Sequence, residues 1–241
     1  MSLIISIHVR EGIVMASDSR MTLNTSEVIQ GQSILNLGAG QSDSNYKTFL
    51  APNNIGISTC GEASIEGVPI AGYIESFINE KLTENVREIN EVPDLLLNYF
   101  QGLSKVPDTR FFIGGYLTED CQRIQQLWEV TVKTGTINQI NNPNDQGAAW
   151  RGEQDVLTRL VQPVWMKDAD GGYYSLPTYD IPWSFFTLQD AIDFAVYAIR
   201  STIESIRFLN RTKTVGGPID VLVIKSNQAF WVKRKELKVN A

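Results

Sequence analysis

An alternating pattern at the start of the chain constrains the fold more than any other feature of the sequence. Apolar residues occupy every second position from Leu3 to Val9, which is the period of a β-strand. Glu11 and Gly12 form a tight turn, and the apolar segment 13–17 returns as a second strand. The chain therefore opens with a β-hairpin, which commits its first sheet to antiparallel pairing.

The rest of the chain alternates blocks of strands with pairs of helices. The pattern predicts an extended hairpin or loop over 23–44, strands at 46–50 and 55–60, helical segments at 61–82 and 92–103, strands at 110–117, 124–133 and 135–140, a helix from about 153 past 160, a loop over 162–184, a helix over 187–206, and a closing hairpin of 219–225 and 228–233. Pro69 implies a late start or a kink in the first helix, and Thr187 to Asp190 form a capping box. Hairpin-linked strands with paired helices predict an α+β fold, in which two mainly antiparallel sheets face each other between outer helices. No repeat or linker divides residues 1–241, so we expect a single domain.

Composition excludes several classes of protein. The net charge of −6 argues against a nucleic-acid or anionic-membrane partner. Two cysteines and one histidine cannot form a disulfide framework or a zinc site, and no motif calls for a metal or a cofactor. The sequence has neither a secretory signal nor an apolar run of about 18 residues. We therefore expect a soluble cytoplasmic protein.

The motifs of histidine-dependent catalysis are absent, so a nucleophile must find its base elsewhere. His8 is the only histidine, and six extended residues place it about 20 Å from Ser2. Cys60 has no evident base and is interpreted as a small buried hydrophobe. If Met1 is removed, Ser2 becomes an N-terminal residue whose own α-amine, with a pKa of about 7.7–8.0, can act as the base. A nearby cation would lower the pKa of that amine and favour its proton-accepting form.

The segment Ile4–Arg20, which contains G-I-V-M-A-S-D-S-R, resembles the start of proteasome β-type subunits. These are N-terminal-nucleophile (Ntn) hydrolases, and the chain is most similar to the bacterial Anbu-type proteasome-like peptidases. Ser2 and Asp18 are sixteen residues apart, as the family's nucleophile and aspartate are. Lys47 and Gly61 are fourteen apart, as its lysine and oxyanion glycine are. An insertion in 23–44 accounts for the longer spacing between Asp18 and Lys47.

The resemblance implies a four-layer αββα sandwich and a catalytic set of Ser2, Asp18, Lys47 and Gly61. Ser2 Oγ would attack the scissile carbonyl and its α-amine would accept the proton. Lys47 would lower the pKa of the amine, Asp18 would orient Lys47, and the Gly61 N–H would bind the oxyanion. The implied substrate is a peptide or polypeptide, and the implied assembly is a homo-oligomeric ring or stack. An ATPase partner and a ring size do not follow from the sequence.

The sequence departs from the family where further residues orient the α-amine. Arg151 stands at the position of a mid-chain serine, and Thr212 and Val215 stand at those of a later aspartate and serine. Asn210, Thr212 or Thr214 could take over this role, and the sequence does not choose among them. Two other functions therefore stay open, namely a catalytically inactive structural subunit of the same fold and a small-molecule amidase.

Overall fold

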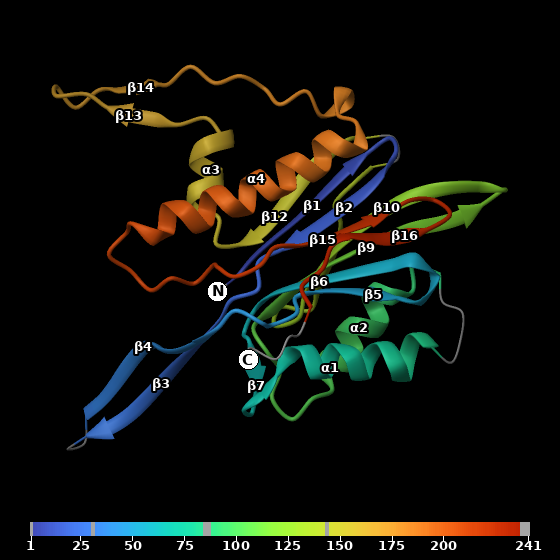
Figure 1. The fold of residues 1–241 in the computed structure, drawn as a ribbon, viewed down its shortest axis with the longest axis horizontal. Helices are drawn as coiled ribbons and strands as arrows, with labels where there is room; N and C mark the ends of the chain where they lie inside the picture. The colour runs from blue at the N-terminus through green and yellow to red at the C-terminus, as the bar shows by residue number, and fades with distance from the viewer. Residues whose placement is uncertain (1, 30–31, 84–87, 143–144, 237–241) are drawn as a thin grey trace.

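The computed structural model describes residues 2–29, 32–83, 88–142 and 145–236, and two five-stranded antiparallel sheets dominate it (Figure 1). The first sheet has the order β12-β1-β2-β15-β16, formed by β12 (Gly147–Gly152), β1 (Leu3–Val9), β2 (Gly12–Ser17), β15 (Asp220–Ile224) and β16 (Ala229–Lys233). The second has the order β11-β10-β9-β6-β5, formed by β11 (Thr136–Gln139), β10 (Gln122–Thr131), β9 (Thr109–Glu119), β6 (Ile55–Gly61) and β5 (Thr48–Ala51). The predicted α+β class with antiparallel sheets is confirmed.

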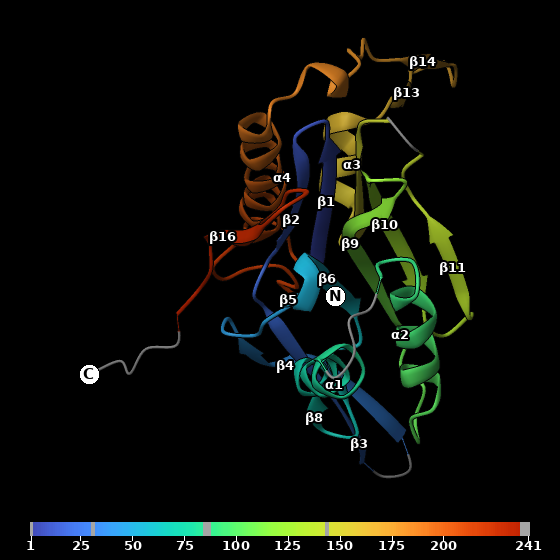
Figure 2. The same ribbon diagram turned by 90° about the vertical axis from the view of Figure 1, so that its right-hand side faces the viewer.

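Helices lie against both sheets, on the sides turned away from each other (Figure 2). The first sheet carries α3 (Asp155–Val161) and the long α4 (Leu188–Arg207). The second carries α1 (Ile70–Phe77), the irregular helical segment η2 (Ile78–Thr83) and α2 (Val92–Gln101). None of the helices in the described ranges is long and apolar enough to cross a membrane.

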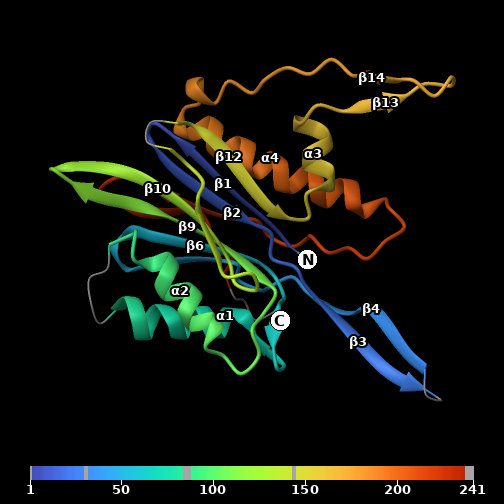
Figure 3. The ribbon, with the colours of Figure 1, turned by 180° about the vertical axis from the view of Figure 1, so that it is seen from behind.

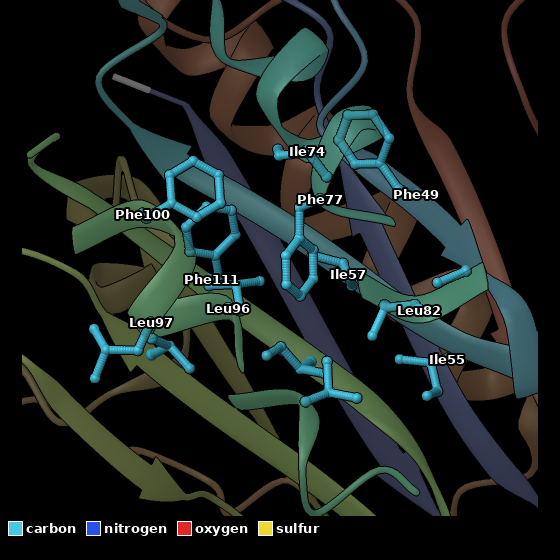
Figure 4. Close-up of a cluster of buried hydrophobic side chains, with 14 of the residues drawn as sticks. Phe49, Ile55, Ile57, Ile74, Phe77, Leu82, Leu96, Leu97, Phe100 and Phe111 are labelled. Atoms are coloured by element: carbon cyan, nitrogen blue, oxygen red, sulfur yellow. The ribbon is translucent and has the colours of Figure 1, made fainter. Parts of the chain in front are cut away.

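Three apolar clusters hold these elements together. One joins α1 and α2 to the second sheet and includes Phe77, Phe100 and Phe111 (Figure 4). A second joins α4 to β1 and β2, and a third contains Ile4, Met15 and Phe112 from the facing sides of the two sheets. The polar positions of β1 are therefore not solvent-exposed: Ser6 and His8 are buried. The alternation in β1 separates two buried faces, of which one packs on α4 and the other faces the second sheet.

Two hairpins project from this body (Figures 1 and 3). The polar segment 23–44 lies within a hairpin of β3 (Met21–Ile29) and β4 (Gln32–Ser42), which is one of the two forms predicted for it. The predicted loop 162–184 contains β13 (Trp165–Lys167) and β14 (Tyr173–Ser175), followed by a 3-10 turn, η3 (Trp183–Phe185). Short local pairings such as β13–β14 lack an alternating pattern in the sequence, and so periodicity does not predict them.

The late start that Pro69 implies for the first helix is confirmed, as is the capping box of the long helix, whereas one strand is missing from the prediction. The helix predicted over 61–82 begins only at Ile70, after the small strands β7 (Ser64–Ile65) and β8 (Val68–Pro69). Pro69 immediately precedes α1, as expected of a residue that has no N–H to donate within a helix. Strand β12 is missing from the prediction, and it is an edge strand paired with β1. The Thr187 capping box is present at the start of α4, where the Thr187 N–H donates to Asp190 Oδ2 at 2.8 Å.

Candidate active site

The four residues predicted for catalysis lie at the ends of four strands from the two sheets. Ser2 immediately precedes β1 and Asp18 immediately follows β2, in the first sheet. Lys47 immediately precedes β5 and Gly61 ends β6, in the second. Antiparallel pairing brings these ends together, because Ile4 pairs with Ser17 and Thr48 pairs with Ser58. The two hairpins thus deliver their flanking residues to one end of the sheets.

A chain of buried hydroxyl groups joins the two sheets next to these strand ends. Thr48 Oγ1 donates to Ser17 Oγ at 2.9 Å, and it lies 3.1 Å from Ser58 Oγ. The three side chains come from β5, β2 and β6. Ser17 and Thr48 are the immediate neighbours of Asp18 and Lys47, so this contact fixes the distance between the strands that carry the ion pair.

Asp18 is fully buried and accepts four hydrogen bonds, two at each carboxylate oxygen. Oδ1 accepts from the Leu3 N–H at 3.0 Å and from Lys47 Nζ at 2.7 Å. Oδ2 accepts from the backbone N–H groups of Arg20 and Gly216, both at 3.0 Å. A buried carboxylate needs such a complete set of donors, because it has given up its hydrogen bonds to water. Asp18 therefore connects the start of the chain, the lysine and the segment before β15.

Lys47 is buried together with Asp18, and its side chain reaches the Asp18 carboxylate. Its ammonium donates to Asp18 Oδ1 and to the Arg20 carbonyl at 2.6 Å, which uses two of its three N–H groups. Burial lowers the pKa of Lys47, and the negative charge of Asp18 opposes that shift. The lysine thus shares a carboxylate oxygen with the N–H of Leu3, the residue that follows the predicted nucleophile. A buried cation in this place is what the predicted role of Lys47 requires.

A partly buried ion pair near the surface supports this arrangement. The Arg20 guanidinium makes a bidentate contact with Asp43, both hydrogen bonds being 2.7 Å long. The contact raises the pKa of Arg20 and lowers that of Asp43. Gly216 packs against the same guanidinium, since a Cβ atom at that residue would lie 2.4 Å from Arg20 Cζ. A larger residue at 216 would have to displace this guanidinium from its place beside the segment whose N–H donates to Asp18.

Ser2 is buried, and its backbone is held by the neighbouring strand. The Ser2 carbonyl accepts from the Glu153 N–H at 2.7 Å. Gly152 passes so close that a Cβ atom there would lie 1.8 Å from the Ser2 carbonyl oxygen, and its φ of +98° also favours glycine. The predicted removal of Met1 concerns a residue that lies outside the described ranges.

Gly61 shares a cavity with the residues around Ser2. The cavity measures about 230 Å³ and is lined by Cys60, Gly61, Asp108, Arg110, Gly152 and Gln154. Gly61 adopts a φ of +122°, and a Cβ atom on it would lie 2.3 Å from the Asp108 carbonyl oxygen. Only glycine fits this position. Of the four predicted catalytic residues, Gly61 is the one among the residues that line this cavity.

The alternatives to Ser2 fit the site poorly. Burial raises the pKa of the Cys60 thiol to about 12, which keeps it protonated and unreactive near neutral pH. His8 is buried on β1, and burial lowers its pKa while the charge of Asp145 opposes the shift. No group of three or more potential metal ligands occurs among the residues that the structure describes.

Glu153 is a residue of this site that the sequence does not identify. Its side chain is buried and accepts a hydrogen bond from Thr214 Oγ1 at 2.9 Å, and it also pairs with Arg211. Of the three candidates for orienting the α-amine, Thr214 is the one with this contact. In the sequence Glu153 marks only the start of a helix, because a single glutamate in that position gives no other signal.

Comparisons with known proteins identify the fold. No family model matches the sequence, and no curated protein matches it. Anbu from Hyphomicrobium sp. strain MC1 superposes with a TM-score of 0.61 at 13% identity, over 97% of this chain and 88% of that one. Its (Gly-1) mutant gives 0.59 at 14%, over 98% and 86%. Anbu (ancestral beta-subunit) from Yersinia bercovieri gives 0.55 at 15%, over 95% and 86%. The chain thus shares the fold of the Anbu proteins, and the predicted resemblance to them is confirmed at the level of the fold.

Proposed function

We propose that the protein is a proteasome-like Ntn peptidase that hydrolyses peptide bonds through Ser2 after Met1 is removed. The observation that carries the proposal is the buried Asp18–Lys47 pair, whose carboxylate also accepts from the Leu3 N–H. This contact ties the charged pair to the residue next to the nucleophile. The shared fold supports the same assignment. The proposal includes a single domain built as a four-layer αββα sandwich, which the two sheets with their outer helices support.

The proposed reaction needs no group beyond those of the chain and water. The α-amine of Ser2 accepts the hydroxyl proton while Oγ attacks the scissile carbonyl, and the Gly61 N–H donates to the developing oxyanion. The proton passes to the leaving amine as the peptide bond breaks, which leaves an ester on Ser2. Water, deprotonated by the same amine, then hydrolyses the ester and restores the enzyme. Lys47 lowers the pKa of the amine so that it is neutral near physiological pH.

The proposed setting is a homo-oligomeric ring or stack in the cytoplasm that acts on peptides or polypeptides. The fold shared with the Anbu proteins is compatible with this setting. Substrate profiling separates the peptidase from a small-molecule amidase: the first cleaves peptides, while the second prefers acyl amides without a peptide on the leaving side.

A mass-spectrometric experiment tests the nucleophile. Protein isolated from its native host should have a mass that lacks Met1, and a β-lactone probe should add once, at Ser2. Ser2→Ala keeps a small residue after Met1 and so preserves its removal, but it should abolish labelling. Ser6→Ala, which alters another buried serine of β1, should leave labelling intact. Quantitative retention of Met1 on the native protein would refute the proposal.

A catalytically inactive structural subunit is the second candidate, and a specific observation favours it. Arg151 makes a bidentate ion pair with Glu129, at 2.5 and 2.6 Å, and Val215 lies in the apolar cluster under α4. The two positions at which the family has amine-orienting residues are therefore used here for an ion pair and for the apolar core. This candidate predicts a retained Met1, no labelling by the probe, and an oligomeric state that Ser2→Ala does not change.

A further inference from the structure

The peptide group between Ser2 and Leu3 is held on both sides by residues that carry buried carboxylates. The Leu3 N–H donates to Asp18 Oδ1 at 3.0 Å, and the Ser2 carbonyl accepts from the Glu153 N–H at 2.7 Å. The two contacts come from opposite sides because β1 lies between β2, which leads into Asp18, and β12, which leads into Glu153. The position of residue 2 is thus fixed by two strands, of which the sequence predicts only the one ending at Asp18.

The Glu153 carboxylate is held as tightly as that of Asp18. Its side chain is 4% exposed, and Oε1 accepts from Arg211 Nη1 at 3.2 Å. Oε2 accepts from Thr214 Oγ1 at 2.9 Å and from Arg211 Nη2. A buried carboxylate is costly unless its oxygens are paired in this way. The following helix does not need it, because α3 takes Gln154 as its N-cap residue without a side-chain cap.

One short segment of chain contacts both carboxylates. Thr214 donates its hydroxyl proton to Glu153, and two residues later the Gly216 N–H donates to Asp18 Oδ2 at 3.0 Å. The segment 211–216 therefore couples the two sides of the site. An ion pair that only stabilises the fold does not require a link to the Asp18–Lys47 pair. An arrangement that positions residue 2 between two charges requires such a link.

We propose that Glu153 is a positioning residue for the nucleophile, held by Arg211 and Thr214, and that it sets the protonation of the Ser2 α-amine together with Lys47. The proposal rests on the function given above. Lys47 favours the neutral amine, and the negative charge of Glu153 favours the protonated one. The charged groups on the elements around residue 2 are Asp18 and Lys47 on the β2 and β5 side, Glu153, Arg211 and Asp155 on the β12 and α3 side, the Arg151–Glu129 pair between β12 and β10, and Asp108 and Arg110 in the cavity beside Gly152.

Glu153→Gln removes the negative charge and leaves Arg211 with only the more distant Asp155, at 3.9 Å, as an acidic partner, while the backbone N–H to Ser2 stays. Both changes lower the pKa of the α-amine, so we expect its titration to move down by about 0.5 pH unit or more. The acid limb of kcat/KM should move by the same amount, with kcat reduced more than KM is raised. Glu153→Asp, which restores the charge, should recover part of both shifts.

The matched control is Glu129→Gln, which breaks another buried arginine–glutamate pair close to β12. It should leave the amine titration within about 0.2 pH unit of the unmodified chain, because neither Glu129 nor Arg151 makes a described side-chain hydrogen bond to residue 2 or to the segment 211–216. The amine is titrated by competitive acetylation with acetic anhydride, followed on the N-terminal peptide by mass spectrometry. Cleaving an N-terminal fusion directly before Ser2 supplies the free amine in every variant.

The two readouts separate this proposal from the proposed function. A shifted amine titration in a protein that the β-lactone does not label supports the role of Glu153 and refutes the peptidase. Labelling of Ser2 together with an unshifted titration in folded Glu153→Gln supports the peptidase and overturns the role of Glu153. Equal shifts in Glu153→Gln and Glu129→Gln would also overturn it, since they would show a general effect of lost charge pairs.

Discussion

Replacing Asp18 by asparagine tests the structural account of the site most directly. The side chain keeps its size but loses its charge, and one of its acceptor oxygens becomes an NH₂ donor. In the structure four donors point at this carboxylate, namely the Leu3, Arg20 and Gly216 N–H groups and Lys47 Nζ. The amide oxygen can accept from only two of them. The remaining two would face another donor inside the protein.

The magnitude follows from these contacts. Each buried donor without an acceptor costs about 1–3 kcal/mol, and removal of one partner from a buried ion pair costs about 3–5 kcal/mol. The two figures overlap because Lys47 is counted in both. We therefore expect Asp18→Asn to lower the free energy of unfolding by about 4 kcal/mol. Lys47→Met in the same chain removes the unpaired charge and should recover about 1–3 kcal/mol of that loss.

Urea denaturation followed by circular dichroism measures these free energies of unfolding. The control is Asp43→Asn, which removes a carboxylate that is also paired with a basic side chain but is 43% exposed. That pair lies near the surface, so its loss should cost about 1 kcal/mol or less. A loss below about 1 kcal/mol for Asp18→Asn, or one equal to that of the control, would refute the view that Asp18 organises the site.

Three further outcomes follow from individual residues. Gly152→Ala should prevent folding or lower the free energy of unfolding by more than about 3 kcal/mol. The control Gly67→Ala lies at a φ of +84° with no atom within 4 Å, and it should cost only about 1 kcal/mol. Equal losses of the two variants in urea denaturation would contradict the close contact at Gly152. Iodoacetamide at pH about 8 should modify exposed Cys121 in the native protein, and buried Cys60, whose pKa is raised to about 12, only after denaturation. Mass spectrometry that finds both cysteines modified in the native protein would count against the burial of Cys60. Burial lowers the pKa of His8 below 6.5, so the unfolded chain binds this proton first, and stability should fall as the pH drops from 6.5 toward the folded-state pKa. His8→Leu should flatten the curve of unfolding free energy between about pH 7 and pH 5, and an unchanged slope would rule His8 out as its source.

Periodicity and capping predict the elements that form through local patterns. The hairpin of β1 and β2 has a two-residue alternation, and α4 has both a capping box and an apolar face, so each is predicted near its observed bounds. Strand β12 escapes prediction because its sequence, GAAWRG, has little β-propensity. Pairing with residues 3–8 of β1 forms it, and such a long-range contact leaves no mark on the local sequence.

The same distinction separates the predicted from the unpredicted parts of the site. Asp18, Lys47 and Gly61 stand at family spacings within hairpins, so the sequence alone is enough to predict that they flank strand ends. Glu153 acquires its role only through contact with Ser2, 151 residues earlier, and with Thr214, 61 residues later. Its importance comes from tertiary contacts, which a single sequence does not display.

The contact between Asp18 and Gly216 spans 198 residues, and it has a consequence for the order of events during synthesis. Asp18 and the first strand leave the ribosome early, but the fourth donor to the carboxylate is translated near the end of the chain. Strand β2 likewise lacks its neighbour β15 until Asp220–Ile224 has emerged. The set of donors to Asp18 is therefore completed only after residue 216 has been translated. The proposed nucleophile lacks a complete site on any nascent chain that ends before that residue.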